Sequence, residues 1–142
     1  QYGMVVPRFV HAALRNEAIE VHGDGSQSRC FGHVADVIEG LTRLIETPAC
    51  FGTVVNLGNS EEVSILGLAQ RAIELTGSSS EIRFISYDEA YGAGFEDMQR
   101  RVPNLEKAKR LIGYQPTRTL DNIINDVAAE YRNSSANAVA NA

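Results

Sequence analysis

The chain has 142 residues, of which 44% are hydrophobic and 22% are charged, and its formal net charge is −5 at pH 7. This length suits one domain with a single core, and the composition is ordinary for a globular protein. The negative charge argues against nucleic acid as the main partner, because a phosphate backbone requires a basic stripe. A small phosphorylated ligand needs only a few local cations. No apolar run reaches the roughly 18 residues that a membrane span needs, so we expect no membrane partner.

The two cysteines, Cys30 and Cys50, are too few for a disulfide scaffold or a structural zinc site. We interpret both as free thiols in a reducing compartment, and the sequence shows no secretory signal. We therefore expect a cytoplasmic protein. The first residue is Gln1 rather than methionine, which leads us to expect a fragment of a longer protein.

The N-terminal segment predicts a helix followed by a strand. Pro7 is placed in the first helical turn, where its missing N–H costs nothing, and apolar residues recur at helical spacing up to about Arg15. Residues 19–22 then alternate between apolar and polar, as a half-buried strand does.

A glycine-rich turn comes next. Gly23 and Gly25 flank Asp24, so the backbone can turn tightly there and approach a ligand closely. Arg29 is the first cation after this turn and is followed by a very short predicted strand. A guanidinium fixed beside a glycine turn is what a phosphate or carboxylate site requires.

The middle of the chain predicts two helices separated by a strand. Asp36 is placed as the N-cap of the first helix, and Pro48 ends it. Residues 53–57 form a short apolar run that predicts a buried strand. Ser64 can cap the second helix, and Gly77 supplies its left-handed end.

The C-terminal part predicts a strand over residues 82–86 and an aromatic, acidic and glycine-rich loop over 87–97. A helix with an asparagine cap and a glycine end is expected over 104–113, and Thr119 begins the last helix. From residue 133 the chain has only Asn, Ser, Ala and one Val. Nothing there can anchor to a core, so we expect a disordered tail.

Four segments, in the same order along the chain, resemble the C-terminal half of the extended short-chain dehydrogenase/reductase family. These are NAD-dependent nucleotide-sugar epimerases, dehydratases and decarboxylases. Residues 21–36 are similar to the family's V-x-G-D-G-x-Q-x-R-x-F-x-x-V-x-D run, and residues 3–10 to the helix that enters its substrate domain. Residues 54–58 resemble its V-x-N-L-G strand, and 101–116 its R-x-P-D and L-G-W-x-P motifs.

The resemblance implies an α/β fold of the small C-terminal substrate-domain type. Several helices would lie against a few short strands, without the Rossmann core. We expect residues 1–132 to form a nucleotide-sugar-binding domain and 133–142 to be the tail. Asn104 stands where the family has an aspartate, and since asparagine caps a helix about as well, we interpret the change as structural.

The family's chemistry needs NAD and a catalytic tyrosine–lysine pair. The chain has no G-x-x-G-x-x-G or G-x-G-x-x-G run and no Y-x-x-x-K pair. We therefore predict that it holds no catalytic residue, no metal and no NAD of its own. The parent enzyme would bind NAD through its N-terminal domain, and this chain alone would be inactive.

The resemblance assigns the diphosphate of the ligand to two arginines. Arg29 is the first candidate and Arg101 the second, with Arg100 as a plausible substitute for the latter. Charge-assisted hydrogen bonds to phosphate are worth roughly 1.5–3 kcal/mol each. The acid before Arg101, either Asp97 or Glu96, is expected to accept a hydrogen bond from a ribose hydroxyl.

The base is expected to lie against Pro7, Phe9, Val21 and His22, since an apolar wall with main-chain groups commonly holds a planar ring. Helical spacing favours a core position for Phe9. Arg8 stands where some decarboxylase relatives have asparagine, so it could read a uronate carboxylate or point to water.

We expect three partners: a UDP- or dTDP-sugar, the missing NAD-binding domain, and a second copy of the chain in a homodimer. The homodimer is expected because a fragment exposes the apolar surface that normally packs on the missing domain. A different reading is a free-standing, non-catalytic binding or dimerisation module with the same fold. A start codon just before Gln1 would favour that module.

Overall fold

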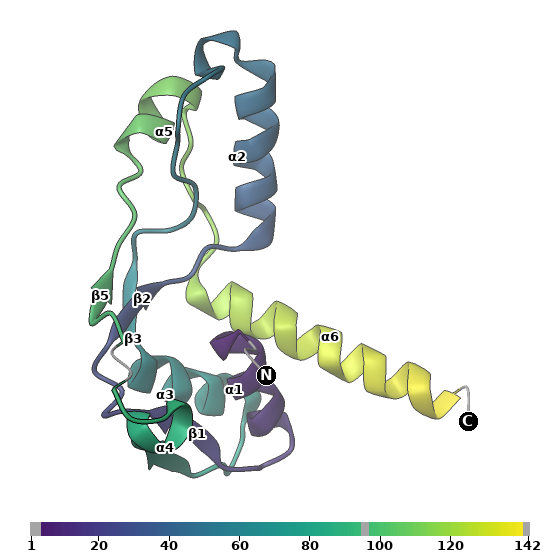
Figure 1. Ribbon diagram of the computed structural model, residues 1–142. Helices are drawn as coiled ribbons and strands as arrows, with labels where there is room; N and C mark the ends of the chain where they lie inside the picture. Colours follow the sequence, from purple (N-terminus) through teal and green to yellow (C-terminus); the bar gives the residue numbers. More distant parts are fainter. Residues whose placement is uncertain (1–3, 95–96, 141–142) are drawn as a thin grey trace.

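The main core lies between three helices in the lower half of Figure 1: α1 (Val5–Leu14), α3 (Ile65–Thr76) and α6 (Leu120–Ala140). The computed structural model describes residues 4–94 and 97–140. Each of the three helices contacts the other two. The side chains that close this core are almost all aliphatic, and the largest fully buried ones include Val10, Leu68 and Ile124.

A two-stranded parallel sheet borders this core. β1 (Ile19–His22) pairs with β4 (Ile82–Ile85), with Ile19 opposite Ile82. Ile19 and Val21 have no exposed surface, whereas the residues between and after them are at least partly exposed. The alternation predicted from the sequence is thereby confirmed. The short helix α4 (Tyr87–Tyr91) follows β4.

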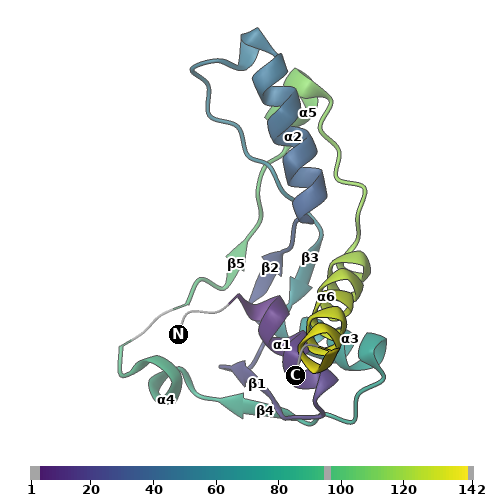
Figure 2. The same cartoon turned by 90° about the vertical axis from the view of Figure 1, so that its right-hand side faces the viewer.

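A second small sheet lies above the first and leads into the upper part of the molecule (Figure 2). Its strand order is β3 (Glu62–Ser64), β2 (Ser28–Cys30), β5 (Arg100–Arg101). β2 runs antiparallel to β3 and parallel to β5. The parallel register places Arg29 directly opposite Arg101.

The upper arm consists of α2 (Val34–Glu46), a 3-10 turn (Pro48–Cys50) and α5 (Glu106–Ile112). Tyr114, 4% exposed, fastens the arm internally. Its hydroxyl donates to the carbonyl of Gly58 (2.8 Å) and accepts from the Gly58 N–H (3.1 Å). None of the helices in the described part is long and apolar enough to cross a membrane.

Several locally encoded features agree with the sequence predictions. The Ser64 hydroxyl caps α3 by accepting from the Gly67 N–H (2.9 Å), and Gly77 ends this helix at a φ of 66°. Gly113 ends α5 in the same left-handed conformation. The overall α/β arrangement, with helices against a few short strands, is also as predicted.

The predicted role of Asp36 is wrong. The N-cap of α2 is His33, whose Nδ1 accepts from the Ala35 N–H (3.1 Å). Asp36 lies within the first turn, is 2% exposed, and accepts hydrogen bonds from Thr117 and Arg118. A local cap pattern could not reveal these partners, because they lie about 80 residues away.

Further segments differ from expectation. Residues 53–57 pair with no strand in the part of the chain that the structure describes, and part of the predicted loop 87–97 is the helix α4. β3 and β5 were not predicted, because each is shorter than a recognisable apolar pattern. α6 continues to Ala140, beyond residue 133 where the tail was expected to begin. Disorder of residues 133–142 stays a prediction about the chain in solution.

Candidate functional site

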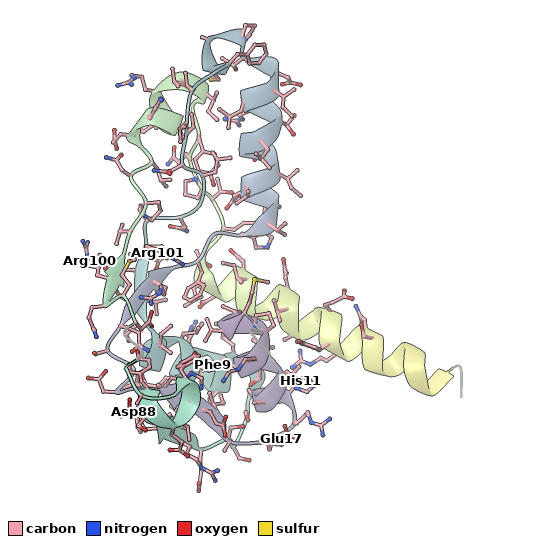
Figure 3. All side chains as sticks on the ribbon, in the orientation of Figure 1. Phe9, His11, Glu17, Asp88, Arg100 and Arg101 are labelled. Carbon is pink, nitrogen blue, oxygen red and sulfur yellow. The ribbon has the colours of Figure 1, made fainter. Side chains whose placement is uncertain are left out.

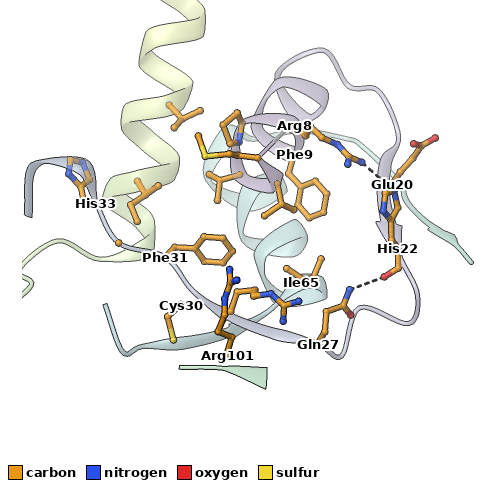
Figure 4. A pocket seen from close by; sticks show the side chains of 18 of the residues that line it. Arg8, Phe9, Glu20, His22, Gln27, Cys30, Phe31, His33, Ile65 and Arg101 are labelled. Carbon is orange, nitrogen blue, oxygen red and sulfur yellow. Dashed lines mark hydrogen bonds between the residues drawn. The ribbon is translucent and has the colours of Figure 1, made fainter. Parts of the chain in front are cut away.

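A cavity of about 690 Å³ opens between α1, β1, the β2–β5 pair and α6 (Figure 4). Its volume falls within the range of about 300–1,000 Å³ that is usual for small-molecule sites. The wall combines apolar and charged groups. Its aromatic side chains are Phe9, Phe31, Tyr87 and Tyr91, and three arginines also line it: Arg8, Arg29 and Arg101.

Arg29 is held firmly in the cavity wall. Its side chain is 15% exposed, and its guanidinium donates to the carbonyls of Ser28 (2.8 Å) and Met98 (2.6 Å). It also forms an ion pair with Asp97, with 2.6 Å between Nη2 and Oδ1. Arg29 thus links β2 to the segment before β5, and Asp97 offsets its charge.

Asp97 is fixed from more than one side. Besides the ion pair, its Oδ1 accepts from the Met98 N–H (2.8 Å), and its Oδ2 lies 3.5 Å from the hydroxyl of Tyr87. Burial and the neighbouring Asp97 carboxylate raise the pKa of Tyr87, so its hydroxyl stays protonated. The alternative candidate, Glu96, lies outside the described residues.

The two arginines of β5 have opposite surroundings. Neighbouring residues of a strand point to opposite faces of the sheet, and Figure 3 shows Arg100 and Arg101 side by side at this edge. Arg100 forms a two-pronged pair with Glu62 (2.9 and 2.6 Å) and does not line the cavity. Arg101 lines it, and no described residue forms a hydrogen bond or ion pair with its guanidinium.

Another part of the wall is formed by Arg8, His22 and Tyr91. The Arg8 Nη2 lies 3.5 Å from His22 Nε2, and His22 Nδ1 lies 2.8 Å from the Tyr91 hydroxyl. The rings of His22 and Tyr91 meet edge to face at 5.1 Å. Burial, and next the charge of Arg8, lower the pKa of His22. The imidazole is therefore neutral near pH 7.

The structure brings together most of the predicted base-binding residues. Pro7, Phe9 and His22 line the cavity, and Phe9 is also a core residue with 3% exposure. Val21 does not line it, because its side chain points into the main core. Sequence reasoning missed Tyr91, whose only signal was the aromatic content of a segment interpreted as loop.

Comparison with known protein families shows to which family the chain belongs. The family model described as GDP-mannose 4,6 dehydratase matches residues 3–127. The chain belongs to this family. The resemblance to extended short-chain dehydrogenase/reductases is thereby confirmed.

Curated relatives of this GDP-mannose 4,6-dehydratase family member include decarboxylases. A UDP-N-acetyl-alpha-D-glucosaminuronate decarboxylase of Bacillus cytotoxicus is 36% identical over 115 residues, which cover 81% of this chain and 36% of the relative. UDP-glucuronic acid decarboxylase 1 of Danio rerio is 40% identical over 123 residues, covering 87% and 28%. The chain thus spans about a third of the length of these relatives.

A solved family structure agrees in fold. The UDP-glucuronic acid 4-epimerase of Bacillus cereus, in complex with UDP-glucuronic acid and NAD, superposes with a TM-score of 0.77 at 25% identity. The match covers 90% of this chain and 40% of the epimerase. The two folds therefore agree over most of this chain.

Proposed function

We propose that this chain binds the nucleoside-diphosphate part of a nucleotide-sugar and orients the sugar for an NAD-dependent epimerisation, dehydration or decarboxylation. The observation that supports this most is the facing pair Arg29 and Arg101 at one cavity wall. Two guanidinium groups on neighbouring strands match the two phosphates of a diphosphate. The relatives with UDP-sugars in their names favour a uracil nucleotide.

The two arginines have different parts in this proposal. Arg101 is the leading diphosphate contact, because its guanidinium has no hydrogen bond or ion pair with a described residue. Arg29 keeps the segment that carries Asp97 next to β2, and would donate to the ligand with an N–H that these contacts do not use. Asp97 would accept from a ribose hydroxyl with the oxygen that now faces Tyr87.

NAD and the catalytic tyrosine–lysine pair would belong to an N-terminal domain, which corresponds to the part of the relatives that this chain does not cover. The sequence has neither a dinucleotide-binding glycine run nor a Y-x-x-x-K pair. The family's chemistry, once NAD is bound, is oxidation of a sugar hydroxyl followed by return of the hydride. We propose that this chain alone binds substrate without turning it over.

The surface for that NAD-binding part is proposed to be the outer face of α2. Val34, Ile38, Leu41 and Ile45 recur at helical spacing and are between 49% and 74% exposed. Val54, 85% exposed, belongs to the extended segment beside the arm. An apolar face of this kind is typical of a protein–protein contact.

Calorimetric titration of the chain with UDP, dTDP and GDP tests the proposal. We expect one base to be preferred, and Arg101→Ala to weaken binding about tenfold to hundredfold, as the loss of a charged hydrogen bond does. Arg100→Ala is the matched control, since the neighbouring Arg100 pairs with Glu62 outside the cavity. Equal losses for the two variants, or no binding of any nucleotide at millimolar concentration, would refute the proposed site.

A further inference from the structure

The proposed function assigns the diphosphate to Arg29 and Arg101 and leaves the wall formed by Arg8 and His22 without a phosphate to hold. Figure 4 shows Arg8 and His22 on one side of the pocket and Arg101 on another, with Phe9 toward Arg8 and Phe31 toward Arg101. A ligand whose phosphates lie at Arg101 can therefore extend toward Arg8 through a cavity that Phe9 and Phe31 also line. What that end can recognise follows from its hydrogen-bonding groups.

The hydrogen bonding of His22 is fixed by its neighbours. A guanidinium only donates, so the His22 Nε2 that lies 3.5 Å from Arg8 must accept. The ring proton is then on Nδ1, which donates to the Tyr91 hydroxyl oxygen at 2.8 Å. The main-chain carbonyl of His22 accepts from the buried Gln27 amide (2.9 Å), which holds the end of β1 in place.

Arg8 is exposed, and among the described residues His22 is the one group that engages its guanidinium. Arg8 lines the cavity, and its guanidinium offers further N–H groups there that can only donate. The complementary ligand group is therefore an acceptor such as a carbonyl oxygen. An amino group at the same place would set donor against donor.

We propose that Arg8 is a specificity-determining residue that donates to the 4-carbonyl of a pyrimidine base, with His22 as the residue that positions it. The inference rests on the proposed function, because it takes the diphosphate to lie at Arg101. In a pyrimidine nucleotide, C4 lies opposite the ring nitrogen that carries the ribose. When the ribose and the diphosphate lie toward Arg101, the 4-substituent is thus the group of the base that lies farthest from Arg101 and nearest to Arg8. Uracil and thymine have a carbonyl there, and cytosine has an amino group.

UDP and CDP are the sharpest pair of probes, because their bases differ mainly in this group. Titration of the chain should show UDP binding about tenfold to hundredfold tighter than CDP, the effect of one charged hydrogen bond. Arg8→Met should abolish the preference by weakening UDP while leaving CDP nearly unchanged. Arg15→Met is the matched control, since Arg15 ends the same helix and pairs with Glu17 outside the cavity.

His22→Phe keeps an aromatic ring but removes the acceptor for Arg8. It should lower the ratio of UDP to CDP affinity, whereas a merely structural role would weaken both nucleotides alike. Thermal unfolding followed by circular dichroism shows that each variant is folded.

The outcomes separate the inference from the function on which it rests. If the chain binds UDP and CDP equally, or if Arg8→Met keeps the preference, the role of Arg8 is wrong. Binding that is still lost in Arg101→Ala would then leave the proposed diphosphate site intact. If the wild-type chain binds neither nucleotide, both proposals fail.

Discussion

At the scale of single residues, Asp36 joins the first turn of α2 to residues 117 and 118. Its carboxylate accepts from the N–H groups of Thr117 (3.2 Å) and Arg118 (3.1 Å), from the Thr117 hydroxyl (3.1 Å) and from the Arg118 guanidinium (2.6 Å). Burial alone would raise the pKa of Asp36, but these hydrogen bonds outweigh it and the pKa is lowered. The folded protein therefore favours the ionised carboxylate.

Asp36→Ala should lower the free energy of unfolding by about 3 kcal/mol, because two backbone N–H groups and a guanidinium lose their acceptor. Urea unfolding measures this change. Glu39→Ala is the matched control, since Glu39 is on the exposed face of the same helix and pairs with Arg43. An exposed pair of this kind is worth about 0.5 kcal/mol or less. Similar losses for both variants would show that the Asp36 contacts contribute little.

His22 should titrate below its ordinary pKa of 6.5, because burial and the charge of Arg8 both oppose its protonation. The pKa of His22 is thus lower in the folded chain than in the unfolded chain, so the unfolded chain binds the proton more readily. Neutral His22 therefore contributes fully to stability above about pH 6.5, and this contribution is lost as the pH falls through the lowered pKa of the folded chain. Imidazole resonances followed by NMR should show a higher pKa in Arg8→Met, with Arg15→Met unchanged. An unchanged midpoint in Arg8→Met would mean that the two groups do not interact.

At the scale of elements, features encoded by neighbouring residues could be predicted and those set by distant contacts could not. Ser64 and Gly77 define α3 through hydrogen bonds within a few residues, so a local pattern was enough. The extended segment 53–57 has the apolar content of a strand, but a strand also needs a partner edge. Likewise, Arg29 was recognised by its motif, whereas its pairing with Asp97 depends on a contact 68 residues away.

Two glycines with a left-handed backbone differ in the space around them, so their substitution separates the cost of backbone strain from the cost of side-chain crowding. Gly77 has a φ of 66° with open space around its missing Cβ, and Gly25 has a φ of 73° at the junction of β1 and α3. A Cβ on Gly25 would lie 2.8 Å from Val21 Cγ1 and 2.9 Å from Leu66 Cβ. These contacts are too short, and the Gly25 carbonyl also accepts from the Leu66 N–H (3.0 Å).

We therefore expect Gly77→Ala to cost about 1 kcal/mol for the left-handed backbone alone. Gly25→Ala should cost about 2–4 kcal/mol, since overpacking of the junction adds to the same backbone cost. Guanidinium unfolding of the two variants in parallel gives the difference. If Gly25→Ala is no more destabilising than Gly77→Ala, then β1 and α3 can move apart without loss.

On the scale of the whole molecule, the main core and the arm bury their side chains differently. The main core is continuous between α1, α3 and α6, whereas α2 in the arm buries only Asp36 and Gly40 completely. The rest of its apolar residues lie half-buried against α5 and the extended segment or face outward. The arm therefore has an incomplete core, which a second protein surface would close.

This incomplete core predicts that the 142-residue chain associates with itself. Sedimentation velocity should show a dimer whose fraction rises with concentration, since burying the α2 face removes apolar surface from water. Ile38→Lys with Ile45→Lys should keep the chain monomeric, because both side chains are exposed and belong to this face. Its melting temperature at low concentration should stay close to that of the wild type, which confirms that the substitutions act on association. A wild-type chain that stays monomeric at several hundred micromolar, a range in which weak dimers form, would show that α2 has no affinity for its own copy.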